Sequence, residues 1–449
     1  MRIMDWFRPG IMIKRWIFLG ILGIASISFG LSFIFRDIYH SMIEVILSGF
    51  LVISGCVFII LSVKYVVKTF FHLISNSGFK ISLDSDRLSS MLIEKRILIK
   101  GPKIVAIGGG TGLSTMLRGL KSYSSNITAI VTVADDGGGS GVLRSDLGIL
   151  PPGDIRNCVL ALADTEPIME KLLQYRFEDG MLKGQSFGNL FLAAMNGISS
   201  GFEEAVRKMS DVLAVTGRVL PVTLENVKLY AELEDGTVVC GESNIGKHNT
   251  FHPGRINRVY LEPKSIKPLR DALEAINEAD AVILGPGSLY TSVIPNLLVG
   301  KVCEALINSN AAKIYVCNVM TQPGETDGYT VSDHIKAIEQ HSYSGIIDYC
   351  IVNKSDVPES IKKKYSDDGA QTVEVDVRKL TDEGVRILEG DFVSLRNGLV
   401  RHNPKKLAET IIDLVAEVVL AKDKKRIIDY YYIKDRLKKT NGKKTVNND

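Results

Sequence analysis

Two adjacent carboxylates are the sharpest chemical feature of the sequence. Asp135 and Asp136 follow a β-rich run at residues 127–133 and precede Gly137 and Gly138. Three interpretations fit them: a Mg²⁺ site that a ligand's phosphates complete, a contact to a ribose hydroxyl, or an Asx-type turn that caps the next helix. Because Ser288 lacks a G-x-S-x-G frame and the seven histidines do not cluster, the two aspartates are the only catalytic candidates, and no catalytic residue is assigned.

A glycine-rich turn precedes the aspartates. An apolar run at residues 103–107 ends in Gly108, Gly109, Gly110, Thr111 and Gly112, and a helical pattern follows. Glycine lets a backbone approach a phosphate, and the helix start offers free N–H groups. The sixth position from Gly108 is Leu113 and no Gly-Lys-Ser/Thr follows, so neither NAD binding nor ATP hydrolysis is supported. The turn therefore predicts a phosphate site, and Gly285, Gly287 and Ser288 repeat the arrangement after residues 281–284.

Further polar side chains stand at helix starts and in loops. Asp154 is a candidate N-cap, and Arg156 and Asn157 lie in the first turn of the same helix, where a cation opposes the helix dipole. Arg156 either meets an anion through bidentate hydrogen bonds or is solvated. Asn189, in the first turn of a helix that Ser186 can cap, either reaches a base or sugar or makes a structural hydrogen bond. Thr321 belongs to the polar loop 318–326.

The elements that must position these residues form a repeating pattern. Continuous apolar runs at 103–107, 127–133, 281–284 and 314–317 predict buried parallel strands, with further strands at 349–352 and 373–377. The helical patterns between them predict an α/β, Rossmann-like sheet covered on both faces. Residues 140–280 are predicted as an insertion with helices and a peripheral hairpin over 219–239. Since ligands bind outside the carboxyl ends of parallel strands, the polar loops should surround one site.

The N-terminal segment is of a different kind. Residues 16–35 and 45–63 carry no charge, and each is about long enough to cross roughly 30 Å of hydrocarbon as a helix. Basic residues flank both outer ends, whereas the connecting loop holds a single Arg. The positive-inside rule therefore predicts a cell-membrane hairpin with both termini and the main domain in the cytoplasm. A cleaved signal peptide fits poorly because a second span follows.

Charge is unevenly distributed along the 449 residues. Residues 1–80 carry a net +5 and residues 422–449 a net +6, which leaves −8 of the total +3 for residues 81–421. An acidic middle argues against nucleic-acid binding. Six cysteines without CxxC spacing are typical of buried thiols in a reducing compartment. We therefore predict a membrane anchor at 1–80, a connector at 81–102, a binding domain at 103–421 and a basic tail at 422–449, which is either solvated or in contact with anionic lipid. A homodimer is compatible with this plan.

Six motifs in this order resemble a known family over residues 103–415. They are Gly108-Gly-Gly-Thr-Gly, Ala134-Asp-Asp-Gly-Gly, Pro152-Gly-Asp-Ile-Arg-Asn, Ser186-Phe-Gly-Asn-Leu, Gly285-Pro-Gly-Ser and Thr321-Gln-Pro-Gly-Glu-Thr. The family contains the bacterial gluconeogenesis factors of the YvcK type and, more distantly, the CofD-like transferase that moves 2-phospholactate onto the precursor of coenzyme F420. The bacterial branch resembles this sequence more closely.

The resemblance implies a Rossmann-like fold and a nucleotide-sugar ligand, UDP-N-acetylglucosamine in particular, with a link to cell-shape and cell-wall control during gluconeogenic growth. It makes Gly109, Thr111, Asp135, Asp154, Asn189, Gly287 and Arg401 candidate contacts. Gly139 and Gln185 replace a serine and a histidine that are common in the family, which favours binding over catalysis. Two hypotheses follow: a regulatory nucleotide-sugar binder, or a Mg²⁺-dependent transferase of a phospho-linked group. A membrane scaffold alone would leave the polar loops unexplained.

Overall fold

The structure, a computed structural model, describes residues 13–35, 42–75, 98–251, 254–376, 384–396 and 398–419. They belong to two compact units, Met1–Glu94 and Lys95–Asp449. The predicted tail at 422–449 and most of the predicted connector lie outside the described residues.

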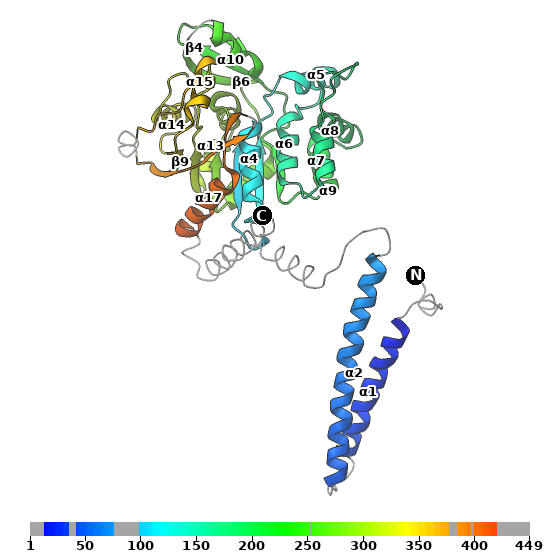
Figure 1. Ribbon diagram of the computed structural model, residues 1–449. Coiled ribbons are helices and arrows are strands. Elements are labelled where there is room, and N and C mark those ends of the chain that lie inside the picture. The colour runs from blue at the N-terminus through cyan, green and yellow to red at the C-terminus, as the bar shows by residue number, and fades with distance from the viewer. Residues whose placement is uncertain are drawn as a thin grey trace. The chain divides into compact units, whose positions relative to one another are not determined.

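The first unit is a pair of helices, α1 (Ile13–Phe35) and α2 (Met42–Ser75) (Figure 1). Their contact depends on glycine, because a Cβ at Gly23 would lie 2.8 Å from the Gly55 carbonyl oxygen. The rings of Trp16 and Tyr65 stack with centroids 4.0 Å apart. Arg15–Ser32 and Val45–Val67 are long and apolar enough to cross a membrane. The two predicted spans are therefore confirmed in length and composition, while their orientation stays a prediction.

A seven-stranded parallel sheet forms the centre of the second unit, in the order β10-β9-β8-β7-β1-β2-β3. The strands are β1 (Ile104–Gly108), β2 (Ile127–Val131), β3 (Arg218–Pro221), β7 (Ala281–Leu284), β8 (Ala312–Val316), β9 (Tyr349–Asn353) and β10 (Arg386–Gly390). The chain builds the sheet outward from β1 to β3, then returns to β7 and builds in the other direction. The predicted Rossmann-like α/β fold is confirmed, and its topological switch point lies between β1 and β7.

Helices cover both faces of the sheet, since every residue of β1, β2 and β7 is buried. One group contains α4, which packs against α6 and α17 (Figure 1), and another contains α11, which packs against α13. The helices are α4 (Gly110–Leu120), α5 (Gly138–Leu147), α6 (Gly153–Leu162), α7 (Pro167–Gln174), α8 (Phe187–Gly197), α9 (Phe202–Val212), α10 (Glu242–Phe251), α11 (Arg270–Glu278), the π-helix η2 (Leu289–Val293), α12 (Ile294–Leu297), α13 (Val302–Asn308), α14 (Val331–Gln340), α15 (Glu359–Asp367) and α17 (Pro404–Val418).

The insertion contains a small antiparallel sheet in the order β5-β4-β6, with β4 (Lys228–Leu233), β5 (Val238–Cys240) and β6 (Ile256–Glu262). The predicted hairpin is confirmed for β4 and β5. Its predicted start was wrong, because Val219 belongs to β3 and pairs in parallel with Ala129 of the main sheet. The alternating pattern runs from an edge strand into the hairpin without a break, so the two could not be separated from the sequence.

The predicted strand at 373–377 is also wrong in the described residues. Thr372 and Glu374 form only isolated bridges, and Asp376 accepts a hydrogen bond from the Ser332 N–H at 3.0 Å at the start of α14. The edge of the sheet is β10 instead, which the sequence missed because none of its residues is fully buried. A two-stranded hairpin, β11 (Val393–Arg396) and β12 (Leu399–His402), follows it.

Candidate functional site

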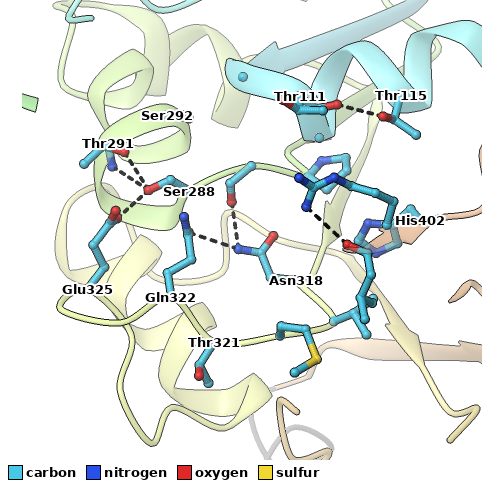
Figure 2. Close-up of a pocket in the computed structure, with 18 of the residues that line it drawn as sticks. Thr111, Thr115, Ser288, Thr291, Ser292, Asn318, Thr321, Gln322, Glu325 and His402 are labelled. Carbon is cyan, nitrogen blue, oxygen red and sulfur yellow. Dashed lines mark hydrogen bonds between the residues drawn. The ribbon is translucent and has the colours of Figure 1, made fainter. Parts of the chain in front are cut away.

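Three of the predicted loops meet at the switch point. They line a cavity of about 380 Å³ at the carboxyl ends of β1, β7 and β8, which we call the glycine-loop cavity (Figure 2). Its lining includes Gly110, Thr111 and Gly112 after β1, Gly287 and Ser288 after β7, and Asn318, Thr321 and Gln322 after β8. The first two loops touch, because a Cβ at Gly112 would lie 2.5 Å from the Pro286 carbonyl oxygen. Gly108, Gly109 and Gly285 do not line the cavity; a Cβ at Gly108 would lie 3.7 Å from Gly285 Cα.

The start of α4 offers backbone donors to this cavity. Gly110 has a left-handed φ of +67°, and the N-cap residue, Gly109, makes no side-chain capping bond. The Gly110 N–H donates to the Asp154 carboxylate. The N–H groups that follow it have no intrahelical acceptor. The loop can therefore hold an anion at Thr111 and Gly112.

Ser288 and Thr321 both line the cavity, but their side chains already have protein partners. Ser288 Oγ donates to Glu325 Oε2 and accepts from Thr291 Oγ1 at 2.6 Å. Thr321 Oγ1 accepts from the Gln371 N–H at 2.9 Å, which leaves its own proton available. Asn318 Nδ2 donates to the Gly287 carbonyl at 2.9 Å. Ser288 and Asn318 thus fix the loops, whereas Thr321 can still donate to a ligand.

Arg401, on β12, supplies positive charge. Among the described residues that line the cavity it is the one Lys or Arg, and its Nη1 donates to the Val400 carbonyl at 3.2 Å. Within the described part of the chain it forms no ion pair. The neighbouring His402 is buried, and burial lowers its pKa to about 4, so it is neutral at pH 7. The guanidinium is therefore the charged donor that could meet an anion.

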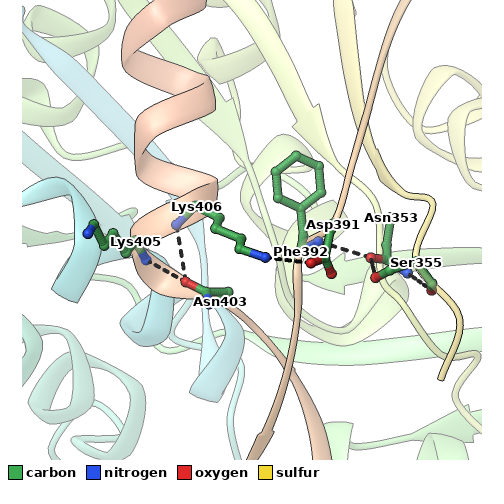
Figure 3. Close-up of polar contacts among 7 residues, drawn as sticks. All are labelled: Asn353, Ser355, Asp391, Phe392, Asn403, Lys405 and Lys406. Carbon is green, nitrogen blue, oxygen red and sulfur yellow. Dashed lines mark hydrogen bonds and ion pairs between the residues drawn. The ribbon is translucent and has the colours of Figure 1, made fainter. Parts of the chain in front are cut away.

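A polar network holds the hairpin that carries Arg401 (Figure 3). At one end, Asn353 Oδ1 at the end of β9 accepts from the Phe392 N–H at 3.0 Å. At the other end, Asn403 caps α17 by accepting from the N–H groups of Lys405 and Lys406 at 3.1 Å. Lys406 also pairs with Asp391. The arginine is therefore placed by the sheet and by α17, not by a free loop.

Four carboxyl groups interact beside the glycine loops: Asp135, Asp154, Glu242 and Glu325, here called the acidic cluster. Burial, with the Asp135 charge, raises the pKa of Asp154 to about 6. Burial, with the charges of the other three, raises the pKa of Glu242 to about 8. Burial raises the pKa of Glu325 to about 7, against the opposing effect of the Ser288 hydrogen bond. Sequence reasoning assigned no role to Glu242 or Glu325, although both line the cavity.

Asp135 and Asp136 have separate local partners. Asp135 Oδ1 accepts from the Gly137 N–H at 2.9 Å, which is the Asx-type turn, and Gly138 begins α5. Asp136 Oδ1 accepts from the Ser243 N–H at 2.8 Å in the first turn of α10. The described residues contain no group of three or more His, Cys, Asp or Glu that could hold a metal. The aspartates therefore fit Mg²⁺ only as a site that a ligand's phosphates complete.

The start of α6 differs from the prediction. Its N-cap is Pro152, so Asp154 as N-cap was wrong; its carboxylate reaches across to the Gly110 N–H. Arg156 is 8% exposed, which rules out the solvated arginine. Its Nη1 donates to Ser186 Oγ and its Nη2 to Asn157 Oδ1, both at 2.8 Å, and within the described residues it forms no ion pair. Burial lowers its pKa, and the charges of Asp154 and Asp135 oppose that effect, so a bidentate bond to an anion stays a prediction.

The start of α8 lies against Arg156. Ser186 caps this helix as predicted, accepting from the Asn189 N–H at 3.2 Å. The Asn189 side chain is buried, and its Oδ1 has no partner in the described structure, as is also true of Arg156 Nε. Neither residue lines the glycine-loop cavity. The structure therefore does not bring all predicted residues to one site. Arg156 and Asn189 lie at the junction of α6 and α8, and the predicted loop 135–138 does not line the cavity either.

A doubly wound parallel sheet with glycine loops around a cavity at its switch point defines a Rossmann-like α/β protein with a ligand site of the usual kind. A family model described as 2-phospho-L-lactate transferase CofD matches residues 104–393. The gluconeogenesis factor of Bacillus subtilis is 51% identical over 317 residues, which is 70% of this chain and 99% of that protein. The chain belongs to the gluconeogenesis factor family, which is related to CofD.

Two further matches differ in which of the two units they cover. A provisionally named gluconeogenesis factor of Clostridium acetobutylicum is 54% identical over 439 residues, 98% of this chain and 97% of that protein. A crystal structure of a UPF0052 family member from Bacillus halodurans matches with a TM-score of 0.66 and 51% identity, covering 69% of this chain and 98% of that one. The Clostridium match must include the helical hairpin, whereas the solved relative has the length of the α/β unit.

Proposed function

We propose that this protein is a membrane-anchored regulator that binds a nucleotide sugar of the UDP-N-acetylglucosamine type through an α/β unit in the cytoplasm. Its role would be control of cell shape and cell wall during growth on gluconeogenic carbon. The observation that carries the ligand proposal is the glycine-loop cavity, where backbone amides of the α4 start and the Arg401 guanidinium face the same space. Both are donors that suit a diphosphate.

Binding without catalysis is supported by how the polar groups are used. The Ser288 hydroxyl, which would be the candidate nucleophile, donates to Glu325. His402, which would be the candidate base, is buried and neutral. Glu325 is within reach to accept the Ser288 proton, but Ser288 Oγ also accepts from the N–H and the hydroxyl of Thr291. Both lone pairs of the oxygen are therefore occupied, which makes it a poor nucleophile. The contacts of these residues instead favour rigid loops around a ligand.

The membrane part of the proposal has separate support. Two helices are long and apolar enough to span, basic residues flank their outer ends, and the Clostridium relative matches across them. The positive-inside rule would then place the α/β unit in the cytoplasm. Fusing a reporter that works only in the cytoplasm to the C-terminus, and to the loop at residues 36–41, tests this: activity at the loop alone would overturn it.

The ligand is tested by calorimetry on the full chain in detergent. UDP-N-acetylglucosamine should bind with measurable heat and raise the melting temperature of the α/β unit. UDP, UDP-glucose, GDP and ATP serve as comparisons. Absence of heat and of a thermal shift with all five compounds would overturn the proposal.

A second candidate function is a Mg²⁺-dependent transferase of a phospho-linked group, favoured by the CofD match and by the acidic cluster beside the glycine loops. A metal there would neutralise phosphate charge without a protein nucleophile. The test is product formation from activated donors with Mg²⁺. Asp135→Asn should abolish product while binding persists; Asp136→Asn is less informative because Asp136 also holds α10. Absence of product with the unmodified protein would count against transfer.

A further inference from the structure

A second cavity of about 540 Å³ adjoins the glycine-loop cavity and shares Glu325 with it. We call it the side cavity. Its charged and aromatic side chains are Glu234, Arg255, Glu325, Asp327, Tyr329 and Asp368. They come from the insertion, from the loop after β8 and from the end of α15, and none was predicted as a site residue. Its volume is within the usual range of roughly 300–1,000 Å³ for small-molecule sites.

The loop after β8 forms the wall between the two cavities. Gly324 has a φ of +80°, and a Cβ there would overlap the Gly246 carbonyl of α10. Its N–H donates to Asp327 Oδ2 at 2.7 Å, and the Glu325 N–H donates to the Gln322 carbonyl at 3.0 Å. The loop is therefore fixed on both sides, and Glu325 is held by the Ser288 hydroxyl. A ligand that reaches past Glu325 would meet a preformed surface.

The two cavities differ in charge. The glycine-loop cavity offers backbone amides and Arg401, which suit phosphates. The side cavity has four carboxyl groups and one arginine, a balance that repels a further phosphate. Carboxylates accept hydrogen bonds from hydroxyls, and Tyr329 adds an aromatic ring that a hydrogen bond of 2.8 Å to the Tyr290 hydroxyl holds in place. This chemistry suits an uncharged, hydroxyl-rich group.

We propose that the side cavity binds the sugar part of the ligand, while its phosphates lie against the glycine loops. The inference rests on the proposed function and adds to it the residues that would discriminate one nucleotide sugar from the nucleotide alone. Glu234 and Asp368 are the informative positions, because both are exposed and their carboxylates form no hydrogen bond or ion pair within the described part of the chain. Their replacement should leave the fold unchanged.

The experiment compares affinities for UDP-N-acetylglucosamine and UDP, measured by calorimetry on the full chain in detergent. The double variant Glu234→Gln/Asp368→Asn should lower the affinity for the nucleotide sugar by roughly 5- to 10-fold and leave the affinity for UDP unchanged. The control is Asp367→Asn, a neighbouring exposed carboxylate of α15 that lines neither cavity. It should change neither affinity.

The outcomes separate this inference from the proposed function. If the unmodified protein binds neither compound, the proposed function fails first, and this inference fails with it. If the unmodified protein binds both compounds and the double variant binds each with unchanged affinity, the side cavity is not the sugar site, although the protein still binds nucleotides. An equal loss for both compounds would show a structural effect and would also overturn the inference.

Discussion

The glycine loops and two members of the acidic cluster, Glu242 and Glu325, line the same cavity, yet the loops and the cluster are built in different ways. The loops present backbone groups, and each follows a strand of the main sheet within a few residues. The acidic cluster presents side chains, and its members come from α6, α10, the loop after β2 and the loop after β8. One region attracts phosphate and the other repels it unless protons or a cation intervene. The comparison indicates that binding strength depends on the loops, whereas its response to conditions depends on the carboxyl groups.

Adding a methyl group where the two glycine loops touch should have the largest effect on ligand binding. In Gly112→Ala the new Cβ would lie 2.5 Å from the Pro286 carbonyl oxygen, so the loops must separate. We expect a loss of about 1–3 kcal/mol of stability and loss of measurable nucleotide binding, checked by thermal unfolding and calorimetry. Gly217→Ala is the control, since its Cβ would overlap the Ile127 carbonyl at the amino end of β2 and Gly217 does not line the cavity. It should destabilise the fold without removing binding at a temperature where the variant is folded.

The contrast between backbone loops and side chains from distant segments explains what the sequence could predict. Residues 104–112 form strand, glycine turn and helix within nine positions, so local patterns suffice to place the first loop. The shared edge of the polar loops followed from four such units, because parallel strands must end at one edge. The order of the strands was not needed for this step.

Glu242 and Glu325 escaped prediction for a physical reason. Glu242 opens α10, outside the main sheet, and only the packing of the insertion brings it beside Asp135. Glu325 stands in a motif that the sequence did identify, but its role depends on the Ser288 contact from another loop. Similarly, the burial of Arg156 depends on Gly188, where a Cβ would lie 2.5 Å from Arg156 Cδ. Such long-range placements carry no local sequence pattern.

Removing the cavity's positive charge should have the next largest effect. Arg401→Ala is expected to weaken nucleotide-sugar binding by about 1.5–3 kcal/mol, on the order of 10- to 100-fold, since a charge-assisted hydrogen bond to phosphate is lost. Arg396→Ala is matched to it, because Arg396 lies on the same hairpin, is exposed and does not line the cavity. Calorimetry should show normal binding for the control. Equal losses in both variants would mean that overall charge, not the position of Arg401, attracts the ligand.

Titrating the acidic cluster should have the smallest effect. The pKa of Glu242 is raised to about 8 and that of Glu325 to about 7, so both gain negative charge as pH rises from 6 to 9. Affinity for a nucleotide sugar should then fall by roughly 3- to 10-fold, and Glu242→Gln should reduce this dependence. Stability follows the same sign: a carboxyl whose folded pKa is raised stabilises the fold at low pH and loses that contribution as pH rises through about 8.

The control for this titration is Glu203→Gln, because Glu203 is a carboxyl of α9 that does not line the cavity. The pH dependence of its ligand affinity should equal that of the unmodified protein.

Adding Mg²⁺ gives the sharpest test of the comparison between the loops and the acidic cluster. If the ionised carboxylates bind the cation together with the ligand's phosphates, added Mg²⁺ should cancel the loss of affinity at high pH or reverse it. Affinity that rises with pH when Mg²⁺ is chelated would contradict the repulsive role assigned to the cluster. In that case the carboxyl groups would act as hydrogen-bond acceptors for the ligand, and the two regions would be one binding surface.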